Sequence, residues 1–244
     1  MKAALVTGSS RGIGRAIALR LARDGFRVIV NYAADEAAAK EVVRLVEEQG
    51  GSALAVQADL GDPAQVEALA ERVKLESGVL DVLVNNAGVA VHRPIEEETP
   101  ESFDRHFAVN VKGLFFLTQR LLPLIPDGGR IVNVTSGVTR IAFPGAIAYS
   151  MTKGAVQTFT LALAKQLGPR GITVNNVAPG IIDTDMNAGF LRDNPEGRAN
   201  AAGYHAVGRV GRPEEIADVV AFAASPEASF MTGTTLDATG GGNL

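Results

Sequence analysis

Short apolar segments alternate along the chain with longer segments in which apolar residues recur every three or four positions. The short segments, such as Val28-Ile29-Val30 and Ile172-Thr173-Val174, are almost wholly apolar, which is typical of parallel strands covered by helices on both sides. The pattern predicts strands at 2–7, 27–32, 52–57, 80–85, 129–135, 172–178 and 233–237, and helices at 13–24, 35–49, 63–77, 101–119, 148–167 and 213–224.

This alternation predicts an α/β fold with a single domain, residues 1–244, in which helices flank both faces of a doubly wound, parallel, seven-stranded sheet. In such a fold, ligands bind at the carboxyl ends of the strands. The least regular stretch runs from about 183 to 211 and contains Gly189, Pro195 and Gly203. We expect a mobile lid over the substrate there, with a long surface loop as the alternative.

Composition narrows the possible functions. Hydrophobic residues make up 46% of the 244 residues, enough for a large core. A net charge of −4 gives no electrostatic reason to expect a nucleic acid or an anionic membrane as partner. The sequence has no cysteine, which excludes disulfides and thiolate metal sites. The first strand begins near Lys2 and no apolar run approaches the roughly 20 residues of a membrane span, so we expect a soluble cytoplasmic protein.

A glycine-rich turn joins the first predicted strand to the first predicted helix. Gly8, Gly12 and Gly14 have the spacing G-x-x-x-G-x-G, which is neither the G-x-G-x-x-G fingerprint nor a Walker loop. Glycines at such a junction let the backbone approach a pyrophosphate, and the N–H groups at the start of the helix favour an anion. The segment therefore predicts a Rossmann-type dinucleotide site, with a turn that binds no ligand as the alternative.

Tyr149 and Lys153 lie one helical turn apart, so their side chains point to the same side of the predicted helix. A nearby ammonium group stabilises a phenolate and lowers the pKa of a tyrosine from about 10, which makes it a usable proton donor. By itself this spacing also occurs on many solvated helices. His92, His106 and His205 show no metal-ligand spacing, so we assign them to surface or packing and expect no metal.

Several motifs occur in a fixed order along the chain: Thr7 to Gly14, Asn85-Asn86-Ala87-Gly88, Asn110, Ser136, Tyr149 with Lys153, and Pro179-Gly180. In this order they resemble the short-chain dehydrogenase/reductase family from end to end. Within that family the chain looks most like the 3-oxoacyl-(acyl-carrier-protein) reductases of bacterial fatty acid synthesis. The resemblance implies an enzyme, an NADP-dependent oxidoreductase that interconverts a ketone and a secondary alcohol.

The cofactor implied by the resemblance is NADP(H). An acid at the end of the second strand would bind the ribose of NAD and repel a 2′-phosphate, but here the strand ends at Asn31 and Tyr32 and the first acid is Asp35. Arg11 in the glycine turn offers a guanidinium to that phosphate. The implied cofactor-binding residues are Gly8, Ser10, Arg11, Gly12, Ile13, Gly14, Asn31, Tyr32, Asp59, Leu60, Asn86, Ala87, Gly88, Tyr149, Lys153, Pro179, Gly180, Ile182 and Thr184.

The resemblance also implies four catalytic residues. Tyr149 protonates the substrate oxygen, and Ser136 donates a hydrogen bond to it. Lys153 lowers the pKa of Tyr149 and holds the nicotinamide ribose, and Asn110 anchors a water relay from the lysine. Taken singly, Ser136 also fits a turn cap beside the competing hydroxyl of Thr135, and Asn110 also fits a structural use of its side chain.

The first substrate implied is a 3-oxoacyl thioester on an acyl carrier protein, which would dock on Arg130 and Arg170 near the mouth of the site. Both residues fit ordinary surface arginines equally well. Two segments, 89–95 and 122–129, depart from the pattern of the carrier-linked reductases. The alternatives are a free ketone, a polyketide, a sugar or another secondary alcohol, and more remotely an NADP-binding regulator without catalysis. The resemblance further implies a homotetramer, in which helices 101–119 and 148–167 and the C-terminal strand contact neighbouring subunits.

Overall fold

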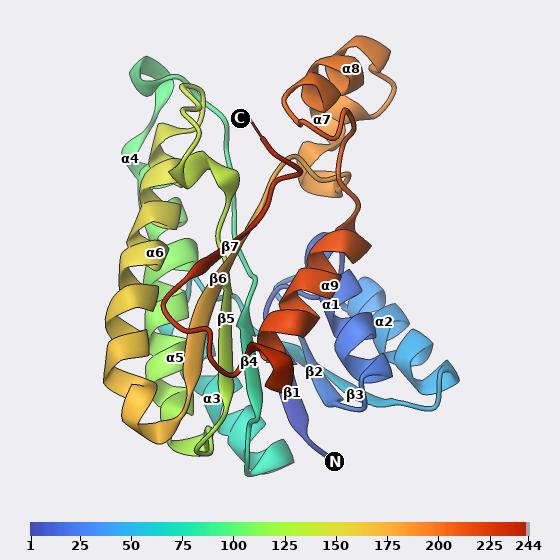
Figure 1. Cartoon of the computed structure of the whole chain (residues 1–244), viewed down its shortest axis with the longest axis vertical. Coiled ribbons are helices and arrows are strands. Elements are labelled where there is room, and N and C mark those ends of the chain that lie inside the picture. The colour runs from blue at the N-terminus through green and yellow to red at the C-terminus, as the bar shows by residue number, and fades with distance from the viewer. Residues whose placement is uncertain (243–244) are drawn as a thin grey trace.

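The computed structural model describes residues 1–242 and contains one sheet in the order β3-β2-β1-β4-β5-β6-β7 (Figure 1). All its strand pairs are parallel. The strand order reverses between β1 and β4, which places a ligand crevice at their carboxyl ends. The strands are β1 Ala3–Val6, β2 Arg27–Tyr32, β3 Ser52–Gln57, β4 Val82–Asn85, β5 Arg130–Val134, β6 Thr173–Pro179 and β7 Thr235–Ala238.

Helices cover both faces of the sheet, as the sequence predicted (Figure 1). Alternate residues of each strand bury against opposite layers: Val6 and Val30 pack with α1, α2 and α9, whereas Leu5 and Ile29 pack with α3, α5 and α6. Within residues 1–242, no helix is both long and apolar enough to cross a membrane. The helices are α1 Gly12–Arg23, α2 Glu36–Glu48, α3 Pro63–Ser77, α4 Pro100–Phe107, α5 Leu114–Leu121, α6 Ile147–Leu167, α7 Ala188–Leu191, α8 Pro195–Gly203 and α9 Pro213–Ala224.

The helix predicted at 101–119 is interrupted. Its middle, Ala108–Gly113, is a π-helical segment between α4 and α5. A Cβ on Gly113 would lie 2.1 Å from the carbonyl oxygen of Leu60, so the helix backbone runs directly against the loop after β3. Such wide turns often occur at functional sites, and this one contains Asn110. The hydrophobic period alone does not reveal it, because the apolar face continues through the interruption.

The stretch 183–211 is more regular than the sequence predicted. It contains α7 and α8, which lie beyond the carboxyl ends of the strands and enclose a small apolar cluster of Leu191, Ala201 and Val210 (Figure 1). Asn194 and Pro195, which we interpreted as loop residues, instead begin a helix. The Asn194 side chain accepts a hydrogen bond from the Gly197 N–H at 2.8 Å, and the proline occupies the first turn, where its missing N–H costs nothing.

A buried polar chain crosses the sheet beneath the ligand crevice. Asn85 of β4 donates to Asn133 of β5 at 2.9 Å, and Asn133 donates to Thr160 of α6 at 2.8 Å. Thr160 donates to Asn176 of β6 at 2.7 Å, and Asn176 donates to Thr235 of β7 at 3.2 Å. The sequence analysis missed this network, because isolated polar residues in apolar strands do not show which of them meet.

Asn133 supplies both a donor and an acceptor to this chain, so we predict that Asn133→Ala destabilises the fold by about 2 to 4 kcal/mol. The variant leaves buried groups of Asn85 and Thr160 without their partner. Urea denaturation measures the loss. The control Asn200→Ala, on an exposed face of α8, should stay within about 0.5 kcal/mol of the parent protein. Equal stability of the two variants would contradict the prediction.

Candidate active site

The glycine turn between β1 and α1 is held in a backbone conformation that favours glycine. Gly8 and Gly12 have φ values of +61° and +55°. A Cβ on Gly8 would lie 2.8 Å from the Cα of Ala87, and one on Gly14 would lie 2.3 Å from the carbonyl oxygen of Gly8. The turn therefore packs tightly against the loop that follows β4, as the predicted dinucleotide site requires.

Two asparagines brace this turn from opposite sides. The Asn31 side chain accepts a hydrogen bond from the Gly8 N–H at 3.1 Å, and its amide donates to the carbonyl of Ala58 at 3.1 Å. The Asn86 amide donates to the carbonyls of Thr7 and Gly8 at 2.8 and 3.0 Å. Both side chains, predicted to bind cofactor, are thus used to shape the backbone of the turn.

The start of α1 fits a phosphate. Among the described residues no side chain caps the N-terminus of α1, and its first turn contains no acid. The N-cap residue, Arg11, is exposed beside the turn, and Ser10 and Ile13 are partly exposed. Thr184 faces the same turn, because its Cγ2 lies 3.4 Å from the position of a Cβ on Gly12. Free N–H groups, the helix dipole and an adjacent guanidinium together favour an anionic group.

The structure also defines the surroundings of three further predicted cofactor-binding residues, Tyr32, Asp59 and Leu60. Tyr32 ends β2 and is buried, and Asp35 is occupied as the cap of α2, where it accepts from the Ala38 N–H at 2.9 Å. Asp59 accepts two hydrogen bonds from Arg105 of α4, at 3.1 and 2.9 Å. Arg105 was not among the predicted site residues, because only the fold brings α4 to the loop after β3. Leu60 is buried next to this ion pair.

Tyr149 and Lys153 face the carboxyl end of β5. The Lys153 Nζ lies 5.5 Å from the centre of the Tyr149 ring and donates to the carbonyl of Val134 at 2.8 Å. Ser136, two residues beyond that carbonyl, is partly exposed at the crevice. Thr135 is buried and donates to the carbonyl of Val177 at 3.2 Å. The Ser136 Oγ accepts from the Val138 N–H at 3.3 Å, so Ser136 caps the turn after β5 while it remains at the crevice.

Burial controls the pKa values of this pair. Burial raises the pKa of Tyr149 to about 12, although the adjacent Ser136 hydroxyl acts in the opposite direction. Burial also lowers the pKa of Lys153 to about 8. We expected the pKa of Tyr149 to be lowered by Lys153; burial of the phenolate acts in the opposite direction. Tyr149 is therefore protonated at neutral pH, beside a lysine whose pKa lies well below its usual value.

Asn110 and Lys153 approach each other across Gly88. A Cβ on Gly88 would lie 3.4 Å from the Asn110 Oδ1 and 3.5 Å from the Lys153 Nζ. The Asn110 amide donates to the carbonyl of Val89 and to Thr152, at 2.9 and 3.0 Å, and its Oδ1 accepts from the Val89 N–H at 2.9 Å. The structure thus brings the predicted tetrad together and shows that the Asn110 side chain holds the loop after β4.

The remaining predicted contacts lie at the end of β6. A Cβ on Gly180 would lie 2.9 Å from the carbonyl oxygen of Thr239 and 2.5 Å from the His205 ring, so only glycine fits there. Pro179 is the last residue of β6. Ile182 is 3% exposed and packs in the core, with its side chain against Gly211. His205 and His106 are both buried, whereas His92 is exposed.

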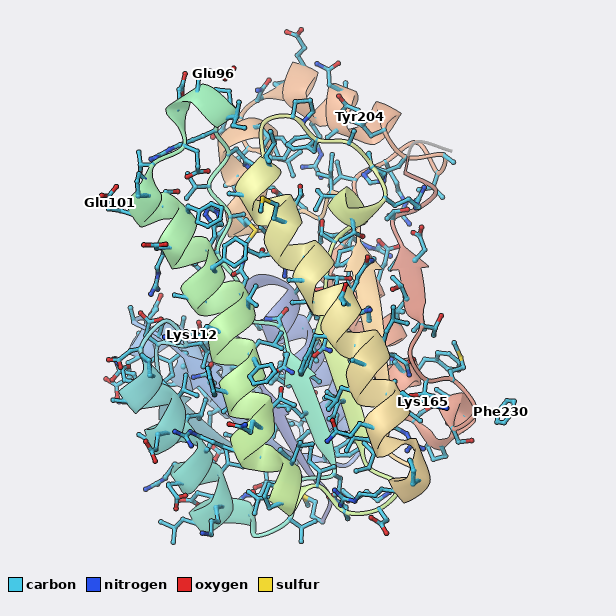
Figure 2. The ribbon with its side chains drawn as sticks, turned by 90° about the vertical axis from the view of Figure 1, so that its left-hand side faces the viewer. Glu96, Glu101, Lys112, Lys165, Tyr204 and Phe230 are labelled. Atoms are coloured by element: carbon cyan, nitrogen blue, oxygen red, sulfur yellow. The ribbon has the colours of Figure 1, made fainter. Side chains whose placement is uncertain are left out.

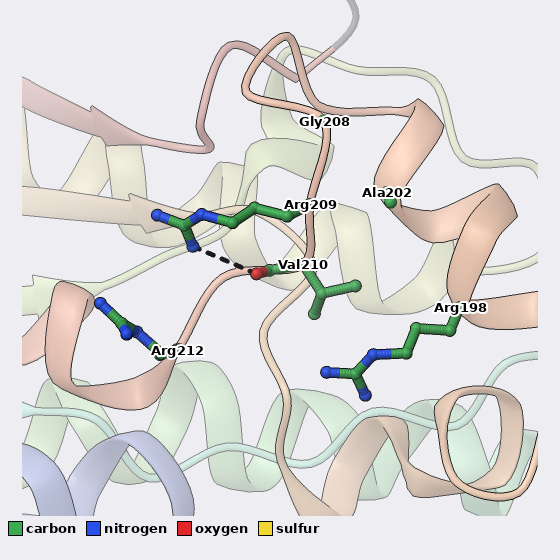
Figure 3. Close-up of a pocket in the computed structure, with 6 residues that line it drawn as sticks. All are labelled: Arg198, Ala202, Gly208, Arg209, Val210 and Arg212. Carbon is green, nitrogen blue, oxygen red and sulfur yellow. Dashed lines mark hydrogen bonds between the residues drawn. The ribbon is translucent and has the colours of Figure 1, made fainter. Parts of the chain in front are cut away.

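A separate hollow of about 360 Å³ lies between α8 and the start of α9 (Figure 3). Arg209 pairs with Glu215 of α9 at 2.5 Å and Arg198 with Asp183 at 2.8 Å, so two of its guanidinium groups join neighbouring segments of the chain. The lining residues are Arg198, Ala202, Gly208, Arg209, Val210 and Arg212. This hollow contains none of the predicted catalytic residues.

Arg130 and Arg170 lie at the other end of the sheet from Tyr149. Arg130 is the first residue of β5 and donates to the carbonyls of Gly129 and Ser225 at 3.1 and 3.3 Å. Arg170 precedes β6 and pairs with Asp127 at 2.9 Å. In a parallel sheet the amino ends of the strands lie opposite the ligand crevice. Within one subunit, the two arginines therefore do not flank the mouth of the site as expected.

The fold and site define an α/β dinucleotide-binding protein with a tyrosine–lysine pair at the carboxyl edge of its sheet. A family model described as enoyl-(acyl carrier protein) reductase matches residues 8–243. The reductase FabG of Staphylococcus aureus, a 3-oxoacyl-(acyl-carrier-protein) reductase, is 39% identical over 98% of this chain and 97% of that protein. The chain belongs to the short-chain dehydrogenase/reductase family.

Two solved structures are more similar in sequence. The reductase LugOII, which catalyses keto-reduction at C1 during lugdunomycin biosynthesis, is 50% identical, with a TM-score of 0.94 over 100% of this chain and 98% of that chain. The angucycline C-6 ketoreductase LanV, solved with bound NADP, is 48% identical, with a TM-score of 0.94 over 100% of this chain and 96% of that chain. These structures confirm the Rossmann-type fold.

The lowered pKa of Lys153 predicts how stability depends on pH. A lysine titrates near 10.5 when unfolded and this one near 8 when folded, so between those values the unfolded chain binds more protons. Stability should therefore rise with pH in this window, by up to about 3 kcal/mol for a shift of this size.

Urea denaturation between about pH 7 and pH 9 tests most of this rise, since up to about pH 9 Tyr149 stays largely protonated in both states. Lys153→Met should remove the rise. Lys165→Met, which changes an exposed lysine on the same helix, should retain it. If the free energy of unfolding of Lys153→Met rose with pH as steeply as that of the parent protein, the rise could not be assigned to Lys153.

Proposed function

We propose that this protein uses NADPH to reduce a ketone to a secondary alcohol, and that the substrate is a bulky apolar ketone of the kind reduced by polyketide ketoreductases. The observation that carries the reaction class is the meeting of Ser136, Tyr149, Lys153 and Asn110 at the carboxyl end of β5, beside the glycine turn. An intact tyrosine–lysine pair also favours an enzyme over an NADP-binding regulator.

The residues of the site have complementary roles in this reaction. NADPH supplies the hydride when bound. Ser136 donates a hydrogen bond to the ketone oxygen, and Tyr149, protonated because its pKa is raised to about 12, gives that oxygen a proton as charge develops on it. Lys153, with its pKa lowered to about 8, has its Nζ 5.5 Å from the centre of the Tyr149 ring, where its positive charge stabilises the phenolate that forms. Asn110 keeps the loop after β4 in place around them.

The start of α1 favours NADPH over NADH. Arg11 is exposed beside the glycine turn, and the nearest acid after β2, Asp35, is directed to the cap of α2. A 2′-phosphate bound there would lie near the Arg11 guanidinium, and no carboxylate at the end of β2 would repel it. The ketoreductase LanV, which this chain resembles over its full length, was solved with bound NADP.

The surface around the crevice favours an apolar substrate. Large hydrophobic side chains are exposed on three segments that follow the carboxyl ends of β4, β5 and β6, and Tyr204 lies on the lid (Figure 2). A group of exposed apolar side chains often marks a binding site for an apolar ligand. The side chains are Val91, Ile95, Phe143, Met186, Tyr204 and Val207. LugOII and LanV act on substrates of lugdunomycin and angucycline synthesis, which supports the same class.

A carrier-linked 3-oxoacyl thioester is the second candidate. The similarity to FabG of Staphylococcus aureus over nearly the whole of both chains favours it. The positions of Arg130 and Arg170 weaken it, because within one subunit both lie at the amino ends of their strands and are engaged with groups of the same chain. The two candidates share one mechanism and differ only in what surrounds the ketone.

We further propose a homotetramer. α4, α5 and α6 lie side by side on one face (Figure 2), where Phe115, Phe116 and Leu161 are exposed. Near β7, Phe222 and Phe230 are exposed as well. Apolar patches on two separate faces fit two kinds of subunit contact, as a tetramer with two-fold symmetry needs.

Initial rates of NADPH oxidation test the function. We expect turnover of a tricyclic or tetracyclic aromatic ketone and slow turnover of acetoacetyl thioesters. Tyr149→Phe should lower kcat by about 10² to 10⁴-fold and leave the affinity for NADPH unchanged, because it removes only the proton donor. The control is Tyr204→Phe, which retains the aromatic ring of Tyr204 and should retain the kcat of the parent protein. Fast thioester turnover would select the second candidate, and a fully active Tyr149→Phe protein would exclude the mechanism.

Arg11→Ala tests the choice of cofactor. Loss of a charge-assisted contact should weaken NADPH binding by about 1.5 to 3 kcal/mol, or roughly tenfold to a hundredfold, and change NADH binding little. Isothermal titration with both cofactors measures the two affinities. Arg23→Ala, at the far end of the same helix, serves as the control. An equal loss for NADH would show that Arg11 does not recognise the 2′-phosphate.

A further inference from the structure

His106 is the most completely buried titratable side chain near the crevice, and both of its ring nitrogens are engaged. Its side chain is 0% exposed. The Nε2 lies 3.0 Å from the backbone nitrogen of Val91, and the Nδ1 lies 2.8 Å from the carbonyl oxygen of Ser102. A backbone N–H only donates, so Nε2 is the acceptor. Nδ1 therefore carries the proton and donates to Ser102.

Asn110 forms hydrogen bonds to the same loop. Asn110, one turn further along the chain, binds both the N–H and the carbonyl of Val89 at 2.9 Å. His106 binds the next available N–H, that of Val91. The two side chains, from α4 and the π-helical segment, thus fix alternate residues of the loop that leaves β4. Beyond Val91, the backbone of this loop has no such anchor to α4 within the described residues.

The loop in turn reaches the helix that carries Tyr149. Arg93 forms a parallel backbone bridge with Ala146, the N-cap residue of α6. The rings of His92 and Phe143 meet edge to face, with centroids 5.7 Å apart. In the part of the chain that the structure describes, no side chain caps the start of α6, so the bridge from Arg93 is an additional backbone contact at that end. Tyr149 follows Ala146 by less than one turn.

We propose that His106 is a positioning residue that fixes residues 91–93 as one wall of the substrate crevice and, through Arg93 and Ala146, orients the start of the Tyr149 helix. The proposal rests on the proposed function for its kinetic consequence. Its structural part stands on the contacts alone. A histidine suits this position because it offers a rigid acceptor for Val91 and a donor for Ser102 at the same time.

Three variants of the full-length protein separate this role from simple packing. His106→Leu fills the space and removes both hydrogen bonds. His106→Gln keeps an acceptor and a donor on one side chain. Ser102→Ala is the matched control, since it retains the backbone carbonyl used by His106, and the Ser102 hydroxyl has no partner among the described residues.

The first readout is amide hydrogen exchange of the protein alone. In His106→Leu, exchange should accelerate by about tenfold at residues 91–93 and 150–153, where the first hydrogen-bonded amides of α6 lie, the loss expected for one neutral hydrogen bond. His106→Gln and Ser102→Ala should remain close to the parent protein. Unchanged exchange at both segments in His106→Leu would overturn the proposal. This readout needs no substrate, so it decides the positioning role even if the protein reduces no ketone.

The second readout is steady-state kinetics with the ketone that the parent protein reduces. His106→Leu should lower kcat/KM for the ketone about tenfold, mainly through KM, while the NADPH dissociation constant stays within about twofold. His106→Gln should restore kcat/KM to within about threefold of the parent. If His106→Gln is as impaired as His106→Leu at equal melting temperature, the hydrogen bonds do not act as proposed. Failure of the parent protein to reduce any ketone would instead refute the proposed function.

Discussion

The hydrogen bond from Lys153 to the carbonyl of Val134 is the contact on which the site depends. It joins the middle of α6 to the carboxyl end of β5 at 2.8 Å, inside the protein, where an ammonium group without a partner would be costly. Because Tyr149 is one turn away on α6 and Ser136 is two residues away on the chain leaving β5, this contact also fixes the distance between the proton donor and the serine hydroxyl. The burial of Tyr149 and Lys153 in this arrangement also raises the pKa of Tyr149 and lowers the pKa of Lys153.

Polar side chains around the crevice act mainly on the backbone. Asn31 and Asn86 hold the glycine turn, and Asn110 and His106 hold the loop after β4. A loop at the end of a parallel strand has no neighbouring strand to satisfy its N–H and carbonyl groups, and buried backbone groups need partners. The short amide side chains of Asn31, Asn86 and Asn110 supply these hydrogen-bond partners. These side chains therefore preorganise the backbone of the crevice, whatever further part Asn110 takes in the reaction.

Family membership and site geometry agree on the reaction and differ on the substrate. The tetrad is the same whether the ketone is free or linked to a carrier, because the hydride and proton are delivered to the same two atoms. What separates the candidates is the surface beyond the tetrad. There, exposed apolar side chains lie on the segments that follow β4, β5 and β6, whereas the arginines expected to meet a carrier lie at the opposite end of the sheet in the same subunit.

The sequence by itself determined the layers and strands of the fold, because two-sided burial imposes apolar strands and a regular alternation with helices. It also determined the glycine turn and the positions of Ser136, Tyr149 and Lys153, since each lies in a short local motif. The tertiary structure decided the rest: the π-helical segment at Asn110, the pairing of Asp59 with Arg105, the helices α7 and α8, the network through Asn133 and the burial of His106. It also decided that burial raises the pKa of Tyr149. These features depend on which distant segments meet and how much water they exclude, and neither is encoded in local spacing.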